Sequence, residues 1–307
     1  MHTLVGIEIG GTKLQIVAGD EHGKVSERLR FAVAASSGGA GIREHIKSAL
    51  PAFVQRTKAV AIGTGFGGPV DWKTGRICCS HQIEGWSEFP LQEWLQELSG
   101  LPTRVDNDAN IAALGEALHG AGQDKNLVFY VTLGSGVGGG MVVDKKIYHG
   151  AMPGESEIGH IRLDRTGTTI ESRCSGWAVD AEMRDLKKLF PDSALGKRLP
   201  NTNGGEAKFL RELVEARDPM ATALLNGIAN DLAFGLSHVV HLFHPEAIVL
   251  GGGLSLVGEP LRAAVAQSLS IYIMHAFEPG PTVALAALKE DAVPIGALAL
   301  AAAVNVP

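Results

Sequence analysis

The chain has 307 residues, of which 45% are hydrophobic, so it is long enough to form two domains with separate cores. Its 27 basic and 33 acidic residues give a net charge of −6, without the basic excess that nucleic acid binding requires, so we expect no nucleic acid partner. The three cysteines fit a reducing cytoplasm, and no signal peptide or bilayer-length apolar run is evident, so we expect a cytoplasmic protein without a membrane partner.

The N-terminal half begins with a strand, a glycine turn and a second strand. TLVGIEI is apolar and β-branched, GGTK interrupts it, and LQIVAGD resumes the pattern. Helical spacing of apolar residues predicts helices over residues 42–54 and 91–99, the second of which ends at Gly100. Between them, KAVAIGTGFGGPVD predicts a buried strand that runs into a turn, and DNDANIAALGEAL then predicts a further helix.

The C-terminal half begins with the same strand, turn and strand. LVFYVTL, GSGVGGG and MVVDKKIYHG follow one another, which gives a weak internal repeat and suggests two related halves that face each other. Helices are predicted over residues 177–190 and 221–243, a strand at AIVL, and a helix from about Glu259. Residues 193–208 are polar and rich in turn formers, so we expect a surface loop there. PIGALALAAAV predicts a closing helix that packs on the first domain.

The stretch LGSGVGGGMVV contains the spacing G-x-G-x-x-G of a dinucleotide-binding turn. That turn must lead into a helix, whose N-terminus attracts the pyrophosphate, whereas a strand follows here. Without Cβ atoms, the backbone N–H groups of both glycine turns are free to surround a phosphate. For either turn alone, an ordinary tight hairpin is the simpler interpretation.

Two further motifs carry polar side chains. Asp106-Asn107-Asp108 stands at a predicted helix start, where Asp108 would stay ionised and accept a proton, although simple helix capping explains an isolated motif as well. In GESEIGH, Glu157 and His160 suit hydrogen bonds to a polyhydroxylated ligand or, for the histidine, metal ligation. A solvated turn is the alternative for this motif.

Taken together and in this order, the motifs resemble the ROK family of sugar kinases over nearly the whole chain. They are IEIGGTK, GTGFGGPVD, VDNDANIAALGEA, TLGSGVGGGMVVDKKIYHGAMPGESEIGH and HPEAIVLGGGLS. The resemblance implies an α/β, two-domain actin-like ATPase (ribonuclease H-like) fold, each domain a mixed β-sheet flanked by helices, with the active site in the interdomain cleft. The implied domains are residues 1–117, completed by the helix 291–307, and residues 118–290.

The resemblance also implies roles for individual residues. Asp108 matches the general base, and Glu8 is a candidate for Mg²⁺. The matches to sugar-binding positions are Asn107, Glu157, His160, Gly67, Gly68 and Ser80. The matches to ATP-binding positions are Gly10, Gly11, Thr12, Lys13, Gly134, Ser135, Gly136, Gly138, Gly251, Gly252 and Gly253.

Three departures from the family pattern stand out. Glu8 replaces the usual aspartate, and Ser135 replaces a threonine but keeps the hydroxyl. The zinc segment C-x-C-G-x-x-G-C-x-E is absent, since TIESRCSGWAVD keeps only Cys174, so we expect no zinc. The sugar-contacting glutamate of that segment is missing too, and the choice between Glu171 and Asp180 as a substitute stays open.

The expected function is ATP-dependent phosphorylation of a sugar hydroxyl, in a hexose or an N-acetylhexosamine with glucose as the default. Polyphosphate as donor, and a homodimer as the assembly, stay open. One alternative is a catalytically degenerate, sugar-binding or regulatory member of the family. The family's repressors carry an N-terminal helix-turn-helix domain, for which the first turn near Glu8 leaves no room. An NAD-dependent dehydrogenase is disfavoured by the strands after the glycine turns.

Overall fold

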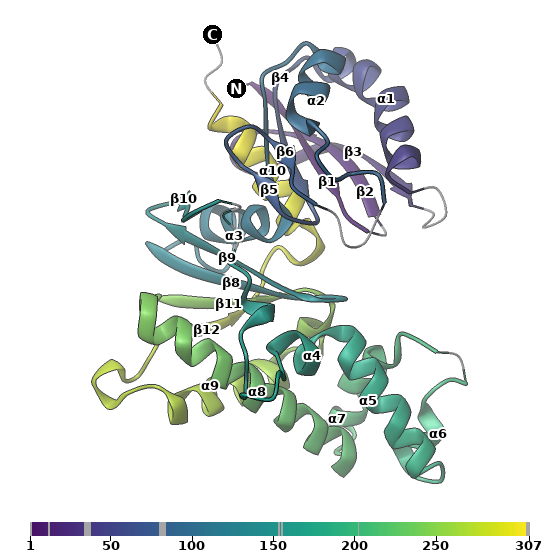
Figure 1. Cartoon of the computed structure of the whole chain (residues 1–307), viewed down its shortest axis with the longest axis vertical. Coiled ribbons are helices and arrows are strands. Elements are labelled where there is room, and N and C mark those ends of the chain that lie inside the picture. Colours follow the sequence, from purple (N-terminus) through teal and green to yellow (C-terminus); the bar gives the residue numbers. More distant parts are fainter. Residues whose placement is uncertain are drawn as a thin grey trace. The chain divides into compact units, whose positions relative to one another are not determined.

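A computed structural model describes residues 2–11, 13–33, 38–79, 84–152, 154, 156–201 and 203–304 (Figure 1). The chain divides into two compact units. Unit 1 comprises Met1–Asn126, Gly140–Ser156 and Ala287–Pro307, and unit 2 comprises Leu127–Gly139 and Glu157–Ala286. The predicted boundary at residues 117 and 118 stays a prediction.

Unit 1 is built on a mixed five-stranded sheet in the order β3-β2-β1-β4-β7. The first three strands are antiparallel, whereas β4 and β7 run parallel to β1. The strands of this sheet are β1 (Thr3–Ile9), β2 (Lys13–Gly19), β3 (Val25–Ala32), β4 (Ala59–Phe66) and β7 (Thr103–Asn107). Unit 1 also contains the short strands β5 (Val70–Asp71), β6 (Arg76–Ile77) and β10 (Lys146–Ile147). Its helices are α1 (Gly38–Thr57), α2 (Leu91–Ser99), α3 (Asp108–His119), η6 (Lys289–Asp291) and α10 (Ala292–Ala302).

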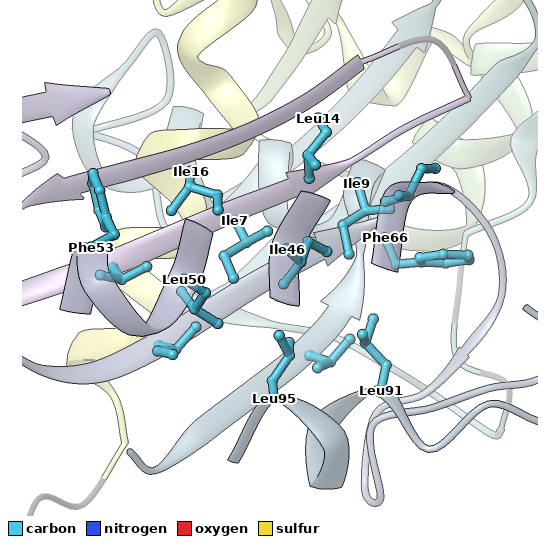
Figure 2. Packing of buried hydrophobic residues seen from close by; sticks show 14 of the residues in the cluster. Ile7, Ile9, Leu14, Ile16, Ile46, Leu50, Phe53, Phe66, Leu91 and Leu95 are labelled. Carbon is cyan, nitrogen blue, oxygen red and sulfur yellow. The ribbon is translucent and has the colours of Figure 1, made fainter. Parts of the chain in front are cut away.

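Alternating side chains of the central strands serve the two faces of this sheet. Figure 2 shows Ile7 and Ile9 of β1 packed with Ile46 and Leu50 of α1, in a buried cluster that also includes Leu95 of α2. On β1, Leu4 belongs instead to a second buried cluster with Leu298 and Ala301 of α10. The last helix of the chain therefore completes the core begun by the first strand.

Helix α10 also lies very close to α3, and a glycine permits the approach. A Cβ on Gly296 would lie 1.9 Å from the carbonyl oxygen of Ile111, which is far inside van der Waals contact. By contrast, a Cβ on Gly227, within α8 (Pro219–Phe243), would meet nothing within 4 Å. Gly296 is thus required by backbone packing, whereas Gly227 is not.

Unit 2 contains the parallel strands β8 (Leu127–Leu133), β11 (Ala247–Gly251) and β12 (Thr282–Leu285). The strand β9 (Val137–Val143) begins in unit 2 and ends in unit 1, and the second sheet has the order β10-β9-β8-β11-β12. Both sheets therefore place a hairpin beside parallel strands, as the internal repeat predicts. The helices of unit 2 are η2 (Ile158–His160), α4 (Ile170–Cys174), α5 (Gly176–Leu189), α6 (Ala194–Arg198), η3 (Glu206–Phe209), α7 (Leu210–Glu215), α8, η4 (Gly253–Val257), α9 (Glu259–Tyr272) and η5 (His275–Phe277).

The predicted surface loop over residues 193–208 is only partly a loop. The short helix α6 lies within it, because the Ser193 side chain accepts a hydrogen bond from the backbone of Gly196 and caps the first turn. The final turn, η3, begins after Gly205. Among the helices that the structure describes, none has the length and apolar character needed to cross a membrane.

Candidate active site

The first glycine turn joins β1 to β2 in unit 1. The backbone N–H of Gly10 donates to the carbonyl of Lys13 over 2.9 Å, and the Lys13 ammonium lies 3.2 Å from Glu8 Oε2. Gly11 follows Gly10 in this turn, whereas Thr12 lies outside the described residues. The turn thus places a lysine charge at the carboxyl end of β1.

Glu8 is a largely buried carboxylate beside this turn. Its Oε2 accepts from the amide of buried Gln15, whose own Oε1 accepts from Arg28 at 2.9 Å and Arg30 at 3.2 Å. Two guanidinium donors on Oε1 fix the amide orientation, so the Gln15 NH₂ faces Glu8. Burial raises the pKa of Glu8, although Lys13 and Gln15 act in the opposite direction. Carboxylate oxygens are the ligands that a hard cation such as Mg²⁺ prefers, so the chemistry of Glu8 at the carboxyl end of β1 fits that ion.

The start of α3 brings Asn107 and Asp108 to the same end of the sheet. Asn107 caps the helix, as its side-chain oxygen accepts from the backbone of Ala109 and Asn110, and its Nδ2 donates to the Gly68 carbonyl at 3.2 Å. Asn107 therefore caps the helix, as the capping alternative for this motif expects. Its amide nitrogen also contacts the turn after β4.

Asp108, half-buried at the first position of α3, lies beside that turn. A Cβ on Gly67 would lie 3.3 Å from Asp108 Oδ2 and 3.6 Å from the Gly10 Cα. The turns after β1 and β4 and the start of α3 after β7 therefore meet at the carboxyl ends of parallel strands, where α/β sheets bind ligands. Ser80, predicted for the same wall, lies outside the described residues.

The second glycine turn joins β8 to β9 in unit 2. Gly134 donates to Gly136 at 3.0 Å, and its carbonyl accepts from the N–H of Gly176 at 2.7 Å. Ser135 is exposed at the tip, and Gly138 lies within β9. Because a strand follows the turn, the dinucleotide interpretation fails.

The third glycine run closes β11 and packs on the second turn. Gly251 ends the strand, and Gly252 has a φ of 77°, with a Cβ position 2.5 Å from the backbone of Leu133. A Cβ on Gly253 would meet nothing within 4 Å. The run thus approaches the residue that immediately precedes Gly134.

Glu157 and His160 are exposed side chains on a loop whose intervening residues are buried. Their side chains are 52% and 73% exposed, and Glu157 Oε2 lies 3.9 Å from His160 Nε2. Between them, Ile158 and Gly159 are buried, and a Cβ on Gly159 would lie 2.2 Å from the carbonyl of Val137. Both polar groups therefore stand next to the second glycine turn, open to a ligand.

A closed turn occupies the place of the missing zinc segment. Asp164 Oδ1 accepts from the Thr166 N–H and hydroxyl and from the backbone of Gly167 and Thr168, and Thr169 caps α4. These hydrogen bonds hold the pKa of Asp164 well below its usual range. Within the described ranges, no three His, Cys, Asp or Glu side chains gather as a metal site.

The two substitutes for the missing glutamate have different surroundings. Both oxygens of Asp180 are bound, to the backbone N–H groups of Gly205 at 2.9 Å and Ala207 at 2.6 Å. Glu171 Oε2 accepts from the backbone of Val137 at 2.9 Å, directly after the second glycine turn. Asp180 thus stabilises the start of η3, and Glu171 is the carboxylate next to the second glycine turn.

We expect the purified protein to lack stoichiometric zinc and to keep its melting temperature after exhaustive chelation. Cys174 is fully buried, and burial raises its pKa to about 12, so it does not supply the thiolate that zinc prefers. Elemental analysis and thermal unfolding check this expectation. If hydrogen bonds to Asp164 hold this turn in place of a metal, Asp164→Ala should lower the melting temperature. One zinc per chain, or unfolding on chelation, would contradict it.

Two residues near the candidate site, Gln15 and His149, were not predicted from the sequence. Gln15 gives one signal in hindsight, because it is a polar residue inside an otherwise apolar strand. His149 gives none, since its partner Asp106 is 43 positions away.

Comparisons with known proteins identify the family of the chain. The ROK family model matches residues 4–304. The glucokinase of Halalkalibacterium halodurans is 32% identical over 95% of this chain and 92% of its own length. A crystal structure of a ROK family glucokinase from Streptomyces griseus, in complex with glucose and AMPPNP, superposes with a TM-score of 0.84 at 30% identity, covering 98% of this chain and 99% of that one. A putative xylose repressor from Caldicellulosiruptor is 27% identical over 96% of this chain and 73% of its own length.

The fold is thus an α/β fold of the actin-like ATPase class, as predicted. The chain belongs to the ROK family.

Proposed function

We propose that this protein is an ATP-dependent sugar kinase that phosphorylates a hydroxyl of a hexose or N-acetylhexosamine, with glucose as the first candidate. The observation that carries the proposal is the position of Asp108, whose carboxylate lies beside the glycine turns after β1 and β4. Phosphoryl transfer requires mainly a base and groups that position the phosphates, and a carboxylate next to backbone amides can supply both. The names of the relatives, glucokinases above all, support the choice of substrate.

Asp108 is the general base. Its carboxylate takes the proton of the attacking sugar hydroxyl while the hydroxyl oxygen forms a bond to the γ-phosphorus. The bond from that phosphorus to the bridging oxygen breaks, and ADP leaves. The sugar is oriented by hydrogen bonds from Asn107, Glu157 and His160, with Gly67, Gly68 and Ser80 as further proposed contacts.

ATP is bound through backbone N–H groups of glycine turns. The first turn contributes Gly10, Gly11, Thr12 and Lys13, the second contributes Gly134, Ser135, Gly136 and Gly138, and the adenosine lies on Gly251, Gly252 and Gly253. Glu8 would hold Mg²⁺, and the Gln15 amide, which donates to its Oε2, would orient it. When bound with ATP, Mg²⁺ neutralises charge on the β- and γ-phosphates.

A coupled ADP-release assay over a panel of hexoses and N-acetylhexosamines with Mg-ATP tests the proposal. Sugar-dependent ADP release, strongest with one panel member, is expected. Replacing ATP by polyphosphate in the same assay identifies the donor. If no sugar elicits ADP release, the kinase assignment is wrong.

One observation favours a second candidate, a sugar-binding or regulatory protein without turnover. The relative named a putative xylose repressor matches nearly the whole of this chain, and the glutamate of the zinc segment is missing. Thermal shift with each sugar separates the candidates, because a stabilising sugar without ADP release indicates the degenerate protein.

A further inference from the structure

The start of α3 is held by a closed ring of side-chain and backbone contacts within unit 1. Asn107 Nδ2 donates to the Gly68 carbonyl, and the Asn107 N–H donates to Asp106 Oδ1 at 2.8 Å. Asp106 Oδ2 lies 2.6 Å from His149 Nε2, and the His149 ring stacks on Trp72 at a centroid distance of 4.2 Å and an angle of 12°. Trp72 stands only four positions after Gly68, so the ring closes on itself.

The two aspartates of the motif Asp106-Asn107-Asp108 are therefore different. Asp106 is 4% exposed in its side chain, and its Oδ1 also accepts from Asn110 Nδ2 at 3.0 Å, so it faces the protein. Asp108 is half-buried and lies near the Cβ position of Gly67. The first carboxylate anchors the helix start, and the second is the proposed general base.

His149 is the member of the ring that joins distant segments. It follows β10, is 17% exposed in its side chain, and bonds to the end of β7 through Asp106 while it covers the Trp72 ring after β5. Without it, Asp106 would lose its partner after β10, and Trp72 would lose the ring that stacks on it. A histidine that served packing alone would need the stack on Trp72 but not the short hydrogen bond to a buried carboxylate.

We propose that His149 is a positioning residue for the sugar-binding wall, which acts through Asp106 on Asn107 and Asp108 and through Trp72 on the Gly67–Gly68 turn. The proposal rests on the proposed sugar kinase function. Positional precision at reacting groups has large kinetic effects, because a displacement of about 1 Å can cost about 100-fold in rate.

The test compares His149→Ala with His149→Gln. The alanine variant removes both the stack and the hydrogen bond, whereas glutamine keeps an amide N–H in place of Nε2 and can still donate to Asp106. His45→Ala is a matched control, since His45 also stacks on an aromatic ring, that of Phe31 at 5.1 Å, but stands on α1. Steady-state kinetics for sugar and ATP, thermal unfolding, and hydrogen exchange of residues 66–72 and 104–112 are measured for each.

For His149→Ala we expect kcat/KM for the sugar to fall about 10- to 100-fold, with KM for ATP nearly unchanged. Amide exchange should accelerate in both segments, His149→Gln should recover most of the loss, and His45→Ala should resemble wild type. The proposal is overturned if His149→Ala leaves kcat/KM and exchange unchanged. It is equally overturned if sugar and ATP parameters decline together with melting temperature and glutamine restores nothing.

The proposed function can fail separately. If the wild-type protein releases no ADP with any sugar, the kinase assignment is wrong. Hydrogen exchange alone then tests whether His149 positions the start of α3. Accelerated exchange in both segments for alanine, reversed by glutamine, supports the positioning of the α3 start by His149. Unchanged exchange contradicts it.

Discussion

Asp108→Ala is expected to lower kcat for sugar phosphorylation by about 10²–10⁴-fold, because a positioned general base contributes that much to a proton transfer. Sugar affinity should change much less, since the hydrogen bonds proposed from Asn107, Glu157 and His160 do not depend on this carboxylate. The fold should persist, because Asn107, and not Asp108, caps the helix. ADP release and sugar-induced thermal shift, measured on the same preparation, separate the two effects.

Asp124→Ala is the control for this prediction. Asp124 is 72% exposed in its side chain and pairs only with the adjacent Lys125 among the ion pairs found in the described residues, so its loss should leave kcat at the wild-type value. Near-normal turnover by Asp108→Ala would remove the assigned base. A large fall in the melting temperature of Asp108→Ala would instead show that Asp108 contributes to the stability of the fold.

Gly296→Ala is expected to destabilise the protein by about 2–3 kcal/mol, the range of a severe overpacking substitution. The new methyl group would lie 1.9 Å from the Ile111 carbonyl oxygen, and because both partners are helix backbone, no flexible side chain can move aside. Helices α10 and α3 must therefore separate, which exposes the cluster formed by Leu298 and Ala301. Urea unfolding followed by circular dichroism measures the change.

Gly227→Ala is the matched substitution, because it also lies inside a helix but has open space at its Cβ position. Alanine has the higher helix propensity, so this variant should be more stable than wild type by about 0.5–1 kcal/mol. Opposite signs for the two variants are the expected result. Equal effects would contradict a tight approach of α3 to α10.

The fold followed from the sequence wherever the pattern was local and strong. Apolar spacing located α2, and Gly100 adopts the left-handed conformation that ends it. The edge strand β3 was not predicted, because VSERLRFA is half exposed and lacks a clear apolar alternation. The helix α6 was missed because its five residues are too few to show a period.

The candidate site was predictable only in its backbone outline. The positions of the glycine turns and of the helix start at Asp108 were predictable through motifs, since turn geometry and helix starts restrict residue types locally. The contacts of His149 with Asp106 and of Gln15 with Glu8 were not, because they depend on pairing across strands and on segments far apart in the chain. Which of Glu171 and Asp180 lies near the second glycine turn likewise required knowledge of the fold.

The position of α10 has a consequence for synthesis of the chain. Unit 1 contains both β1 and α10, so its second buried cluster, with Leu4, Ala61 and Leu298, is incomplete until α10 leaves the ribosome. Until then the face of the sheet opposite α1 is exposed to water and to other nascent chains, whereas unit 2 is fully synthesised before α10 begins. We infer that the protein is most prone to aggregation late in translation, and that C-terminal truncations or tags that displace α10 would prolong that stage.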